Sequence, residues 1–345
     1  MITDLLPSDD QAAIRDSVVA LLSREFPIAR LHGDLASGAG VERARWGMFA
    51  DLGLFGLAVG EQQGGAGFAL PEQVTAAYEL GRFLVSPTVL ATMIAAGFAQ
   101  GEMLESLVAG DARVAFANPV SRLQIHGGGS APVQLLDADG ADFVLLWTDE
   151  GAALHAAPAP GPHVEALDET VSLQRAELAL GGRIAATTGP DIARRGGLLL
   201  SAYLVGIAKA TLEMAVEYSK SRVQFGQEIG AFQAIKHYCA EMARRAEAAT
   251  AQTFYAALDA TVRRDEDMFE AAAARLLAAE AAVDNARFNI QIHGAMGFTY
   301  EADAHLYLKR ALLVSAILSD QRSEQRRIMR SEGLAAAELD LSPPA

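Results

Sequence analysis

An arginine, an aromatic ring and a glycine lie together in the stretch SRVQFGQEIGAFQAIKH, residues 221–237. Arg222 and Phe225 are three residues apart, so we expect them to share one face of a helix that ends at Gly226. The guanidinium of Arg222 offers a rigid fork of donors for a pyrophosphate, and Phe225 offers a flat surface for a ring. The same pattern also fits an ordinary helix end with a solvated arginine and a core phenylalanine.

A second stretch with binding potential, QIHGAMGFTYEADAHLYLKRA, covers residues 291–311. Gln291 and His293 lead into Gly294 and Gly297, which predicts a helix end that exposes backbone N–H and C=O groups. A glycine-rich end is also a common way to terminate a helix, so alone this stretch indicates little.

Three segments of different composition must position these two stretches. Residues 1–110 predict a helical domain, with Ser8 suited to cap its first helix. Residues 111–185 contain short apolar runs closed by Gly, Asp, Asn and Pro, which predicts a compact β domain, expected to be a shortened sandwich. Residues 186–335 are helical again, and residues 336–345 form a tail.

Two long helical patterns in the third segment indicate its architecture. The first runs through Leu200, Leu204, Ile207, Thr211, Met214 and Tyr218, and the second through Phe232, Ile235, Cys239, Met242, Ala246 and Ala249. A period of about 3.5 residues is typical of helices that cross at shallow angles, as in a four-helix bundle. Further helices are expected over residues 267–292 and 302–318.

Composition restricts the classes of function. The net charge of −15 argues against nucleic-acid binding, which needs a basic surface. The chain has 1 cysteine and no Cys/His group with zinc spacing, so no metal site is predicted. The start of the chain has no targeting pattern, and its longest apolar run is shorter than the ~18–20 residues of a membrane span. We therefore expect a cytoplasmic protein that binds no membrane.

Taken together, in order and spacing, the two stretches resemble the acyl-CoA dehydrogenase family. The first family motif is an Arg, two residues and Phe-Gly, then an Ile or Leu and Phe-Gln. The second is a Gln, two residues, a Gly pair and an aromatic residue after the next Gly. The matching positions are Arg222, Phe225, Gly226, Ile229, Phe232, Gln233, Gln291, Gly294, Gly297 and Phe298. Ala295 replaces the second Gly of the pair, and the loop GEQQGGAGFAL of residues 60–70 also resembles the family.

The resemblance implies a fold and a cofactor. The fold is an N-terminal helical domain, a middle β domain and a C-terminal four-helix bundle, assembled as a dimer or a dimer of dimers. In this family the two motifs grip the ADP half of an FAD that is held mainly by the adjacent subunit. The positions expected to bind the cofactor are Arg222, Gln224, Phe225, Gly226, Ile229, Gln291, His293, Gly294 and Ala295. The implied substrate is an acyl-CoA, and the implied electron acceptor is electron-transfer flavoprotein.

The β domain departs from the family's usual pattern. The family's Thr-Glu-Pro followed by Gly-Ser-Asp is replaced by FANPVSRLQIHGGG, residues 116–129, and its Gly-x-Lys-x-(Trp/Phe)-Ile-(Thr/Ser) strand is absent. Those stretches place hydroxyls, N–H groups and an aromatic ring against the isoalloxazine. This chain is therefore expected to offer the flavin ring few of its usual contacts.

The catalytic base is missing from its family positions as well. Desaturation of a thioester needs a carboxylate that removes the α proton while the β hydride leaves for the flavin. The family's usual Glu falls at Leu318, and its alternative position falls near Gly196, which follows Arg195. Asp320 is a candidate for a displaced base, against the alternative of a solvated acid at a helix end.

Three hypotheses about function follow. The first is a short subunit that completes the FAD site of a full-length partner in an α2β2 heterotetramer, similar to those of bacterial steroid side-chain degradation. The second is a self-sufficient, homo-oligomeric acyl-CoA dehydrogenase with a divergent site. The third is a non-enzymatic homologue that acts as a scaffold or binding module.

Overall fold

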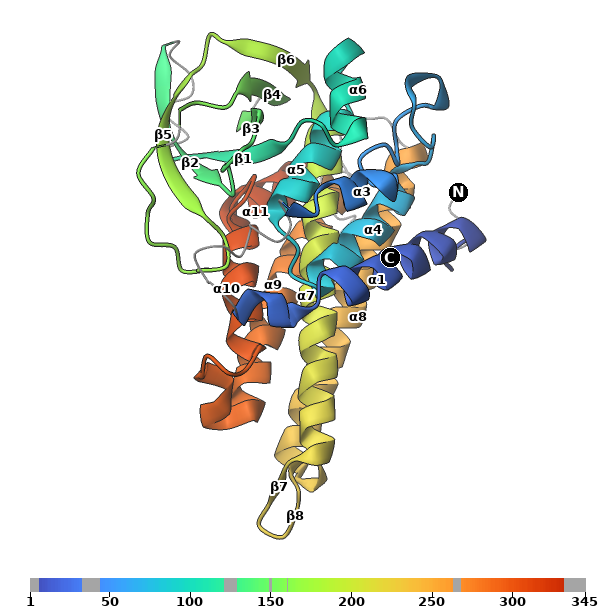
Figure 1. Cartoon of the computed structure of the whole chain (residues 1–345). Helices are drawn as coiled ribbons and strands as arrows, with labels where there is room; N and C mark the ends of the chain where they lie inside the picture. Colours follow the sequence, from blue (N-terminus) through green and yellow to red (C-terminus); the bar gives the residue numbers. More distant parts are fainter. Residues whose placement is uncertain are drawn as a thin grey trace, which may run out of the picture.

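The protein consists of helices, then a β-sheet, then long helices, as the sequence predicted (Figure 1). The structure is a computed structural model that describes residues 6–32, 44–120, 129–148, 151–159, 161–262 and 268–331. The predicted tail over residues 336–345 lies outside this part of the chain, and the predicted domain boundaries remain predictions.

The N-terminal region is a group of short helices around an apolar core. Its helices are α1 (Asp9–Glu25), η1 (Ile28–His32), α3 (Gly47–Asp51), η3 (Glu61–Gln63), α4 (Leu70–Arg82), α5 (Pro87–Ala96) and α6 (Gly101–Ala109). Ser8 caps α1 as predicted, because its side chain accepts a hydrogen bond from the Gln11 N–H while the Gln11 side chain bonds back to the Ser8 N–H.

A six-stranded sheet follows. Its strands are β1 (Val114–Pro119), β2 (Ser130–Leu136), β3 (Phe143–Thr148), β4 (Gly151–Ala156), β5 (Leu173–Ala179) and β6 (Arg183–Thr188), in the order β5-β2-β1-β3-β4-β6. Only the β1–β3 pair is parallel among them. Hydrogen bonds join all six strands in one sheet, which differs from the two facing sheets of the expected sandwich.

Side-chain alternation gives the sheet two apolar faces. Phe116, Leu145 and Trp147 belong to the main core shared with the helices. Ala117 and Leu146 point the other way and join a second, smaller cluster within the β region. Because successive residues of a strand face opposite sides, β1 and β3 contribute to both clusters.

The C-terminal region is built on long helices. These are α7 (Pro190–Ser221), α8 (Gln233–Val262), α9 (Phe269–His293), α10 (Ala304–Ser315) and α11 (Gln321–Arg330), with β7 (Val223–Gln224), β8 (Gln227–Glu228) and η5 (Ile229–Ala231) between α7 and α8, and η6 (Gly294–Phe298) after α9. Leu200, Leu204, Ile207 and Thr211 of the predicted seam are buried, as the shallow packing of helices requires.

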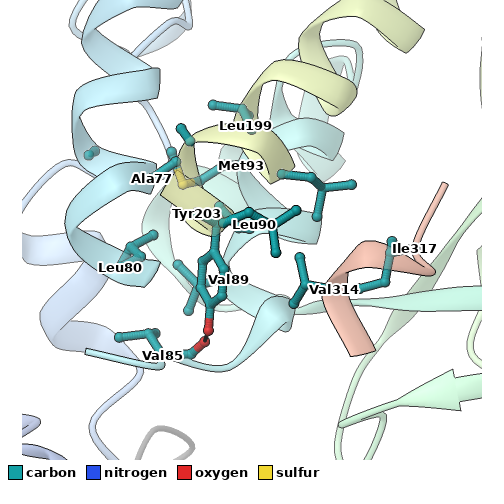
Figure 2. Packing of buried hydrophobic residues seen from close by; sticks show 14 of the residues in the cluster. Ala77, Leu80, Val85, Val89, Leu90, Met93, Leu199, Tyr203, Val314 and Ile317 are labelled. Carbon is teal, nitrogen blue, oxygen red and sulfur yellow. Dashed lines mark hydrogen bonds between the residues drawn. The ribbon is translucent and has the colours of Figure 1, made fainter. Parts of the chain in front are cut away.

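α7 is the central helix of the protein. It crosses α4 so closely that a Cβ on Gly206 would lie 2.0 Å from the carbonyl oxygen of Tyr78. Figure 2 shows the Tyr203 side chain of α7 among apolar residues of several elements, and its hydroxyl donates a hydrogen bond of 2.6 Å to the carbonyl oxygen of Val85. By length and composition the span Asp191–Ser221 is apolar enough to cross a membrane, but 72% of its most apolar window is buried inside the protein. Its apolar side chains therefore serve the core.

Candidate functional site

The Arg222–Gly226 corner is a β-hairpin, so the prediction that Arg222 and Phe225 share a helix face is wrong. α7 ends at Ser221, and Arg222 already has extended backbone angles. Phe225 and Gly226 both have positive φ angles, 53° and 79°. Two successive residues with positive φ form the tight turn that suits a two-residue hairpin, so the chain reverses here instead of winding on. The hairpin projects beyond the ends of α7 and α8 (Figure 1).

The base of the hairpin is fixed to the bundle. The Ile229 N–H donates a hydrogen bond of 2.8 Å to the carbonyl oxygen of Arg222, and the Ile229 side chain is buried. A Cβ on Gly230 would lie 2.9 Å from the carbonyl oxygen of Ser219, so this glycine permits a close approach to α7. Ile229 therefore contributes to the predicted site by anchoring the corner.

The tip of the hairpin faces solvent. Phe225 is 93% exposed, and its ring lies at 88° to the Phe232 ring, with 6.1 Å between the two centroids. Arg222 is exposed, and no carboxylate within the described residues forms an ion pair with it. The Gln224 amide nitrogen donates to the carbonyl oxygen of Val223 beside it. The tip therefore presents a cation and an aromatic face to solvent.

The glycine-rich stretch forms a helix end, as predicted. α9 ends at His293, and Gly294 follows with a φ of 64°, a conformation that glycine adopts without strain. A Cβ on Gly297 would lie 2.7 Å from the carbonyl oxygen of Ile290, so the turn folds tightly back on α9. Gln291, Ala295 and three larger side chains, Met296, Phe298 and Tyr300, are exposed around this end.

A ring stack joins the two stretches at the same end of the bundle. The rings of Tyr218, on the last turn of α7, and His293 are 4.0 Å apart at an angle of 21°. His293 Nδ1 also hydrogen-bonds with the carbonyl oxygen of Asn289, at 2.8 Å. One ring face and one nitrogen of His293 are therefore used within the chain, and they hold the glycine-rich end beside the hairpin.

These residues fit one end of a dinucleotide cofactor. The guanidinium of Arg222 suits a pyrophosphate, the exposed Phe225 ring suits a base, and the amide of Gln291 and the open backbone after Gly294 add neutral donors and acceptors.

The two places where the sequence analysis expects the catalytic base, Leu318 and the Gly196–Gly197 step, lie close together. A Cβ on Gly197 would lie 3.8 Å from Cδ2 of Leu318. A Cβ on the neighbouring Gly196 would lie 2.4 Å from Cζ2 of Trp147, so the indole ring fills the space where a side chain would stand. Leu318 itself has a φ of 74°, a strained conformation for a branched residue. The place expected for the base is therefore occupied by apolar groups.

Asp320 begins the last helix. Its carboxylate accepts a hydrogen bond of 2.7 Å from the Ser323 N–H, which makes it the N-cap of α11. It lines a cavity of about 310 Å³ between α9 and α11, together with Arg275 and Glu324. This geometry agrees with the alternative that the sequence offered, an acid at a helix end. A role of Asp320 as the catalytic base remains a prediction.

Sequence reasoning missed a buried arginine that connects three parts of the chain. Arg310 of α10 pairs with Asp168 at 2.6 Å, donates to the carbonyl oxygens of Leu84 and Val85, and donates to the Tyr203 hydroxyl at 2.7 Å. Burial alone would lower the pKa of Arg310, but the Asp168 carboxylate raises it above its usual value. These partners are distant in the sequence, so no local pattern signals them.

Comparisons with known proteins identify the family. The acyl-CoA dehydrogenase N-terminal domain matches residues 8–107, and the acyl-CoA dehydrogenase C-terminal domain matches residues 194–319. Together these matches cover more than half of the chain, which belongs to the acyl-CoA dehydrogenase family. It is thus related to oxidoreductases that act on CH–CH bonds, and its cofactor is FAD.

Individual relatives agree with this assignment. Acyl-CoA dehydrogenase IpdE2 of Mycobacterium tuberculosis is 31% identical over 331 residues, which are 94% of this chain and 98% of the relative. The ChsE4-ChsE5 complex from Mycobacterium tuberculosis has a TM-score of 0.75 at 24% identity, over 99% of this chain and 100% of the matched one. A variant of the Tcur3481-Tcur3483 steroid ACAD has a TM-score of 0.78 at 22% identity, over 96% of this chain and 99% of the matched one. The two structures support the fold.

Proposed function

We propose that this chain is the short subunit of a heteromeric acyl-CoA dehydrogenase, which completes the FAD site of a full-length partner and itself lacks the catalytic Glu. The observation that carries the proposal is a contrast within the chain. Arg222 and Phe225 are both exposed to solvent. Gly196 and Leu318, the positions expected for the catalytic base, carry no carboxylate. The partner then supplies the base and the contacts to the flavin ring.

The residues at the hairpin and the glycine-rich end have distinct parts in this proposal. Arg222 binds the pyrophosphate, Phe225 covers the adenine, and the backbone around Gly294 and Ala295 with the Gln291 amide binds the remaining polar atoms of the ADP half. Bound FAD supplies the hydride acceptor for α,β-desaturation of the acyl-CoA. Electron-transfer flavoprotein then takes up the electrons.

The partner and substrate classes are supported by relatives. One matched structure is a complex of two named chains, and another is described as a steroid ACAD. We therefore place this subunit in the breakdown of a steroid-derived acyl-CoA. The net charge of −15 favours a small-molecule function over nucleic-acid binding, and a cytoplasmic location suits acyl-CoA chemistry.

The test is an absorbance spectrum of the chain purified alone and of the chain co-expressed with a full-length sister dehydrogenase from the same genome. The proposal expects a colourless chain alone and a yellow complex at the size of a tetramer. A yellow chain with about one flavin per subunit and turnover of an acyl-CoA would instead indicate a self-sufficient enzyme, with Asp320 as the first base to examine. A colourless co-expressed mixture would indicate a scaffold.

A variant of the hairpin sharpens this test. Arg222→Ala is expected to lower the flavin affinity of the complex by at least roughly tenfold, since a charge-assisted bond to phosphate is lost. Arg24→Ala is the matched control, because Arg24 is also exposed and forms an ion pair with its neighbour Glu25. Equal flavin content in the two variants would contradict the proposed role of Arg222.

A further inference from the structure

The cavity of about 310 Å³ between α9 and α11 is a second place where this chain can hold a small molecule. Ser315 of α10 and the turn at Ser319 and Asp320 complete its wall. The volume is at the lower end of the range of small-molecule sites, about 300–1,000 Å³. None of the described residues that line it belongs to the stretches expected to bind FAD. A ligand in this cavity is therefore independent of the proposed function.

Arg275 of α9 is a buried cation in the wall of this cavity. It is 3% exposed, and its Nη2 donates hydrogen bonds to the carbonyl oxygens of Val314, Ser315 and Ile317, at 2.7, 3.2 and 2.9 Å. Its Nη1 is also buried and has no hydrogen-bond partner within the described residues. Burial lowers the pKa of Arg275 to about 10, against the opposing charge of Glu324. A buried donor without an acceptor is costly, so an acceptor supplied by a molecule in the cavity would stabilise this side chain.

Glu324 of α11 is a buried carboxylate in the same wall. It accepts hydrogen bonds from the Ser319 hydroxyl and from Nη1 of Arg327, the latter at 2.8 Å. Its charge acts on the Arg275 guanidinium, but no ion pair joins the two among the described residues. A ligand with an acceptor for one of them and a donor for the other can bridge the pair.

The other charges of the lining select against a simple anion. Four carboxylates and two arginines line the cavity, which gives a formal net charge of −2. Arg287 pairs with Asp284 at 3.5 Å, while Glu280 and Asp320 are exposed. The net negative lining repels an anion, so a carboxylate that binds to Arg275 must carry its own positive charge with it.

An apolar strip of α9 lies beside these polar groups. Leu276, Ala279 and Val283 line the cavity and are three and four residues apart, so they share one face of the helix. A small aliphatic group gains free energy when it is buried against such a strip.

We infer that this cavity binds a zwitterionic α-amino acid with an aliphatic side chain. The carboxylate accepts a hydrogen bond from Nη1 of Arg275, the ammonium group donates to Glu324, and the side chain packs on Ala279 and Val283. In an α-amino acid both charged groups are attached to the same carbon, which suits two opposite charges in one small cavity. A simple anion lacks the cation that the negative lining favours, and a simple amine lacks the acceptor for Arg275.

Titration calorimetry of the full chain with alanine, valine and leucine tests this inference, with each amino acid compared with its N-acetyl and its amide derivative. The N-acetyl derivative has no ammonium group, and the amide has no carboxylate. We expect at least one amino acid to bind with a Kd below about 1 mM, and both of its derivatives to bind roughly tenfold or more weakly, because each loses a charged hydrogen bond. A derivative that binds as tightly as its amino acid overturns the inference, and so does a Kd above that value for all three amino acids.

Variants of α9 locate the site. Arg275→Lys should weaken binding by roughly tenfold or more, since the fork of donors is lost, but Arg275 also holds the end of α10. Val283→Phe leaves every charged group in place and fills the cavity, so it should abolish binding in a chain whose circular dichroism is unchanged. Leu277→Phe is the matched control, because Leu277 is exposed on the same helix and does not line the cavity, and it should keep the Kd within about twofold. Binding that survives Val283→Phe overturns the inference.

Discussion

The two ends of α7 differ in how far their residues are exposed to solvent. At its C-terminal end, Arg222 and Phe225 reach into solvent on a hairpin whose base is anchored by Ile229. At its N-terminal end, Gly196 and Gly197 are packed against an indole ring and a leucine. The difference teaches that one helix can leave an arginine and an aromatic ring exposed at one end while apolar side chains cover its glycines at the other.

The largest expected effect concerns the buried ion pair of Asp168 and Arg310. Asp168→Asn keeps the shape of the side chain but leaves Arg310 as an uncompensated buried cation, so we expect the free energy of unfolding to fall by about 3–5 kcal/mol. Urea unfolding followed by circular dichroism measures it. The matched control is Glu169→Gln, since Glu169 pairs with Lys309 in a partly exposed bridge, and its loss should cost less than about 1 kcal/mol. Similar losses in both variants would show that burial does not distinguish the two bridges.

Gly196→Ala tests whether the base position is filled. The new Cβ would lie 2.4 Å from the Trp147 ring, so overpacking should destabilise the protein by about 1–3 kcal/mol. Gly197→Ala is the control next to it, because its Cβ meets only Cδ2 of Leu318 at 3.8 Å and alanine suits a helix better than glycine by up to about 1 kcal/mol. Thermal unfolding should give shifts of opposite sign, and a Trp147→Leu background should reduce the Gly196→Ala cost. Shifts of the same sign would mean that the indole moves aside.

Phe225→Gly tests the exposed side. Phe225 has a φ of 53° and is 93% exposed, so glycine should leave the chain alone unchanged or more stable by up to about 1 kcal/mol. The same change should weaken flavin retention in the complex, because the ring face is lost. Gly226→Ala, at a φ of 79°, should destabilise the hairpin instead. If Phe225→Gly lowered the stability of the chain alone, the ring would have a structural role that the exposed tip does not suggest.

The smallest effect concerns His305, on the first turn of α10. Burial lowers its pKa from 6.5, helped by Lys309, and neither ring nitrogen has a hydrogen-bond partner. As the pH falls below 6.5, His305 is protonated in the unfolded chain before it is protonated in the folded chain, because its pKa is lower in the folded chain. The free energy of unfolding therefore declines over that window. His305→Leu should flatten this decline in unfolding curves measured between about pH 7 and pH 5. An unchanged slope would assign the decline to other groups.

The fold could be predicted largely because its signals are local. The Ser8 cap, the seam from Leu200 to Thr211 and the short apolar runs of β1, β2, β3 and β5 are visible in neighbouring residues. β4 and β6, with the sequences GAALHA and RIAATT, lack the strong apolar alternation of a strand, so local sequence signals them only weakly. Their pairing depends on each other and on β3.

The site could be predicted only in part. The cofactor-binding role of the corner residues stays a prediction, and a helix face was expected there because spacing alone cannot show that Phe225 adopts a positive φ. The contact of Gly196 with Trp147 and the bond of Arg195 to Gln73 join residues of different elements. Such long-range contacts leave no periodic signal, so the sequence could not show that the Trp147 ring packs against Gly196.

The partners of Arg310 have a consequence for the order in which the protein is made. Domains generally begin to fold from the N-terminus during synthesis. The Leu84 and Val85 carbonyl groups and the Asp168 carboxylate emerge from the ribosome long before residue 310. Until then the growing chain must carry these groups without their cation. The N-terminal helices and the sheet can reach their final arrangement only after nearly the whole chain has been translated.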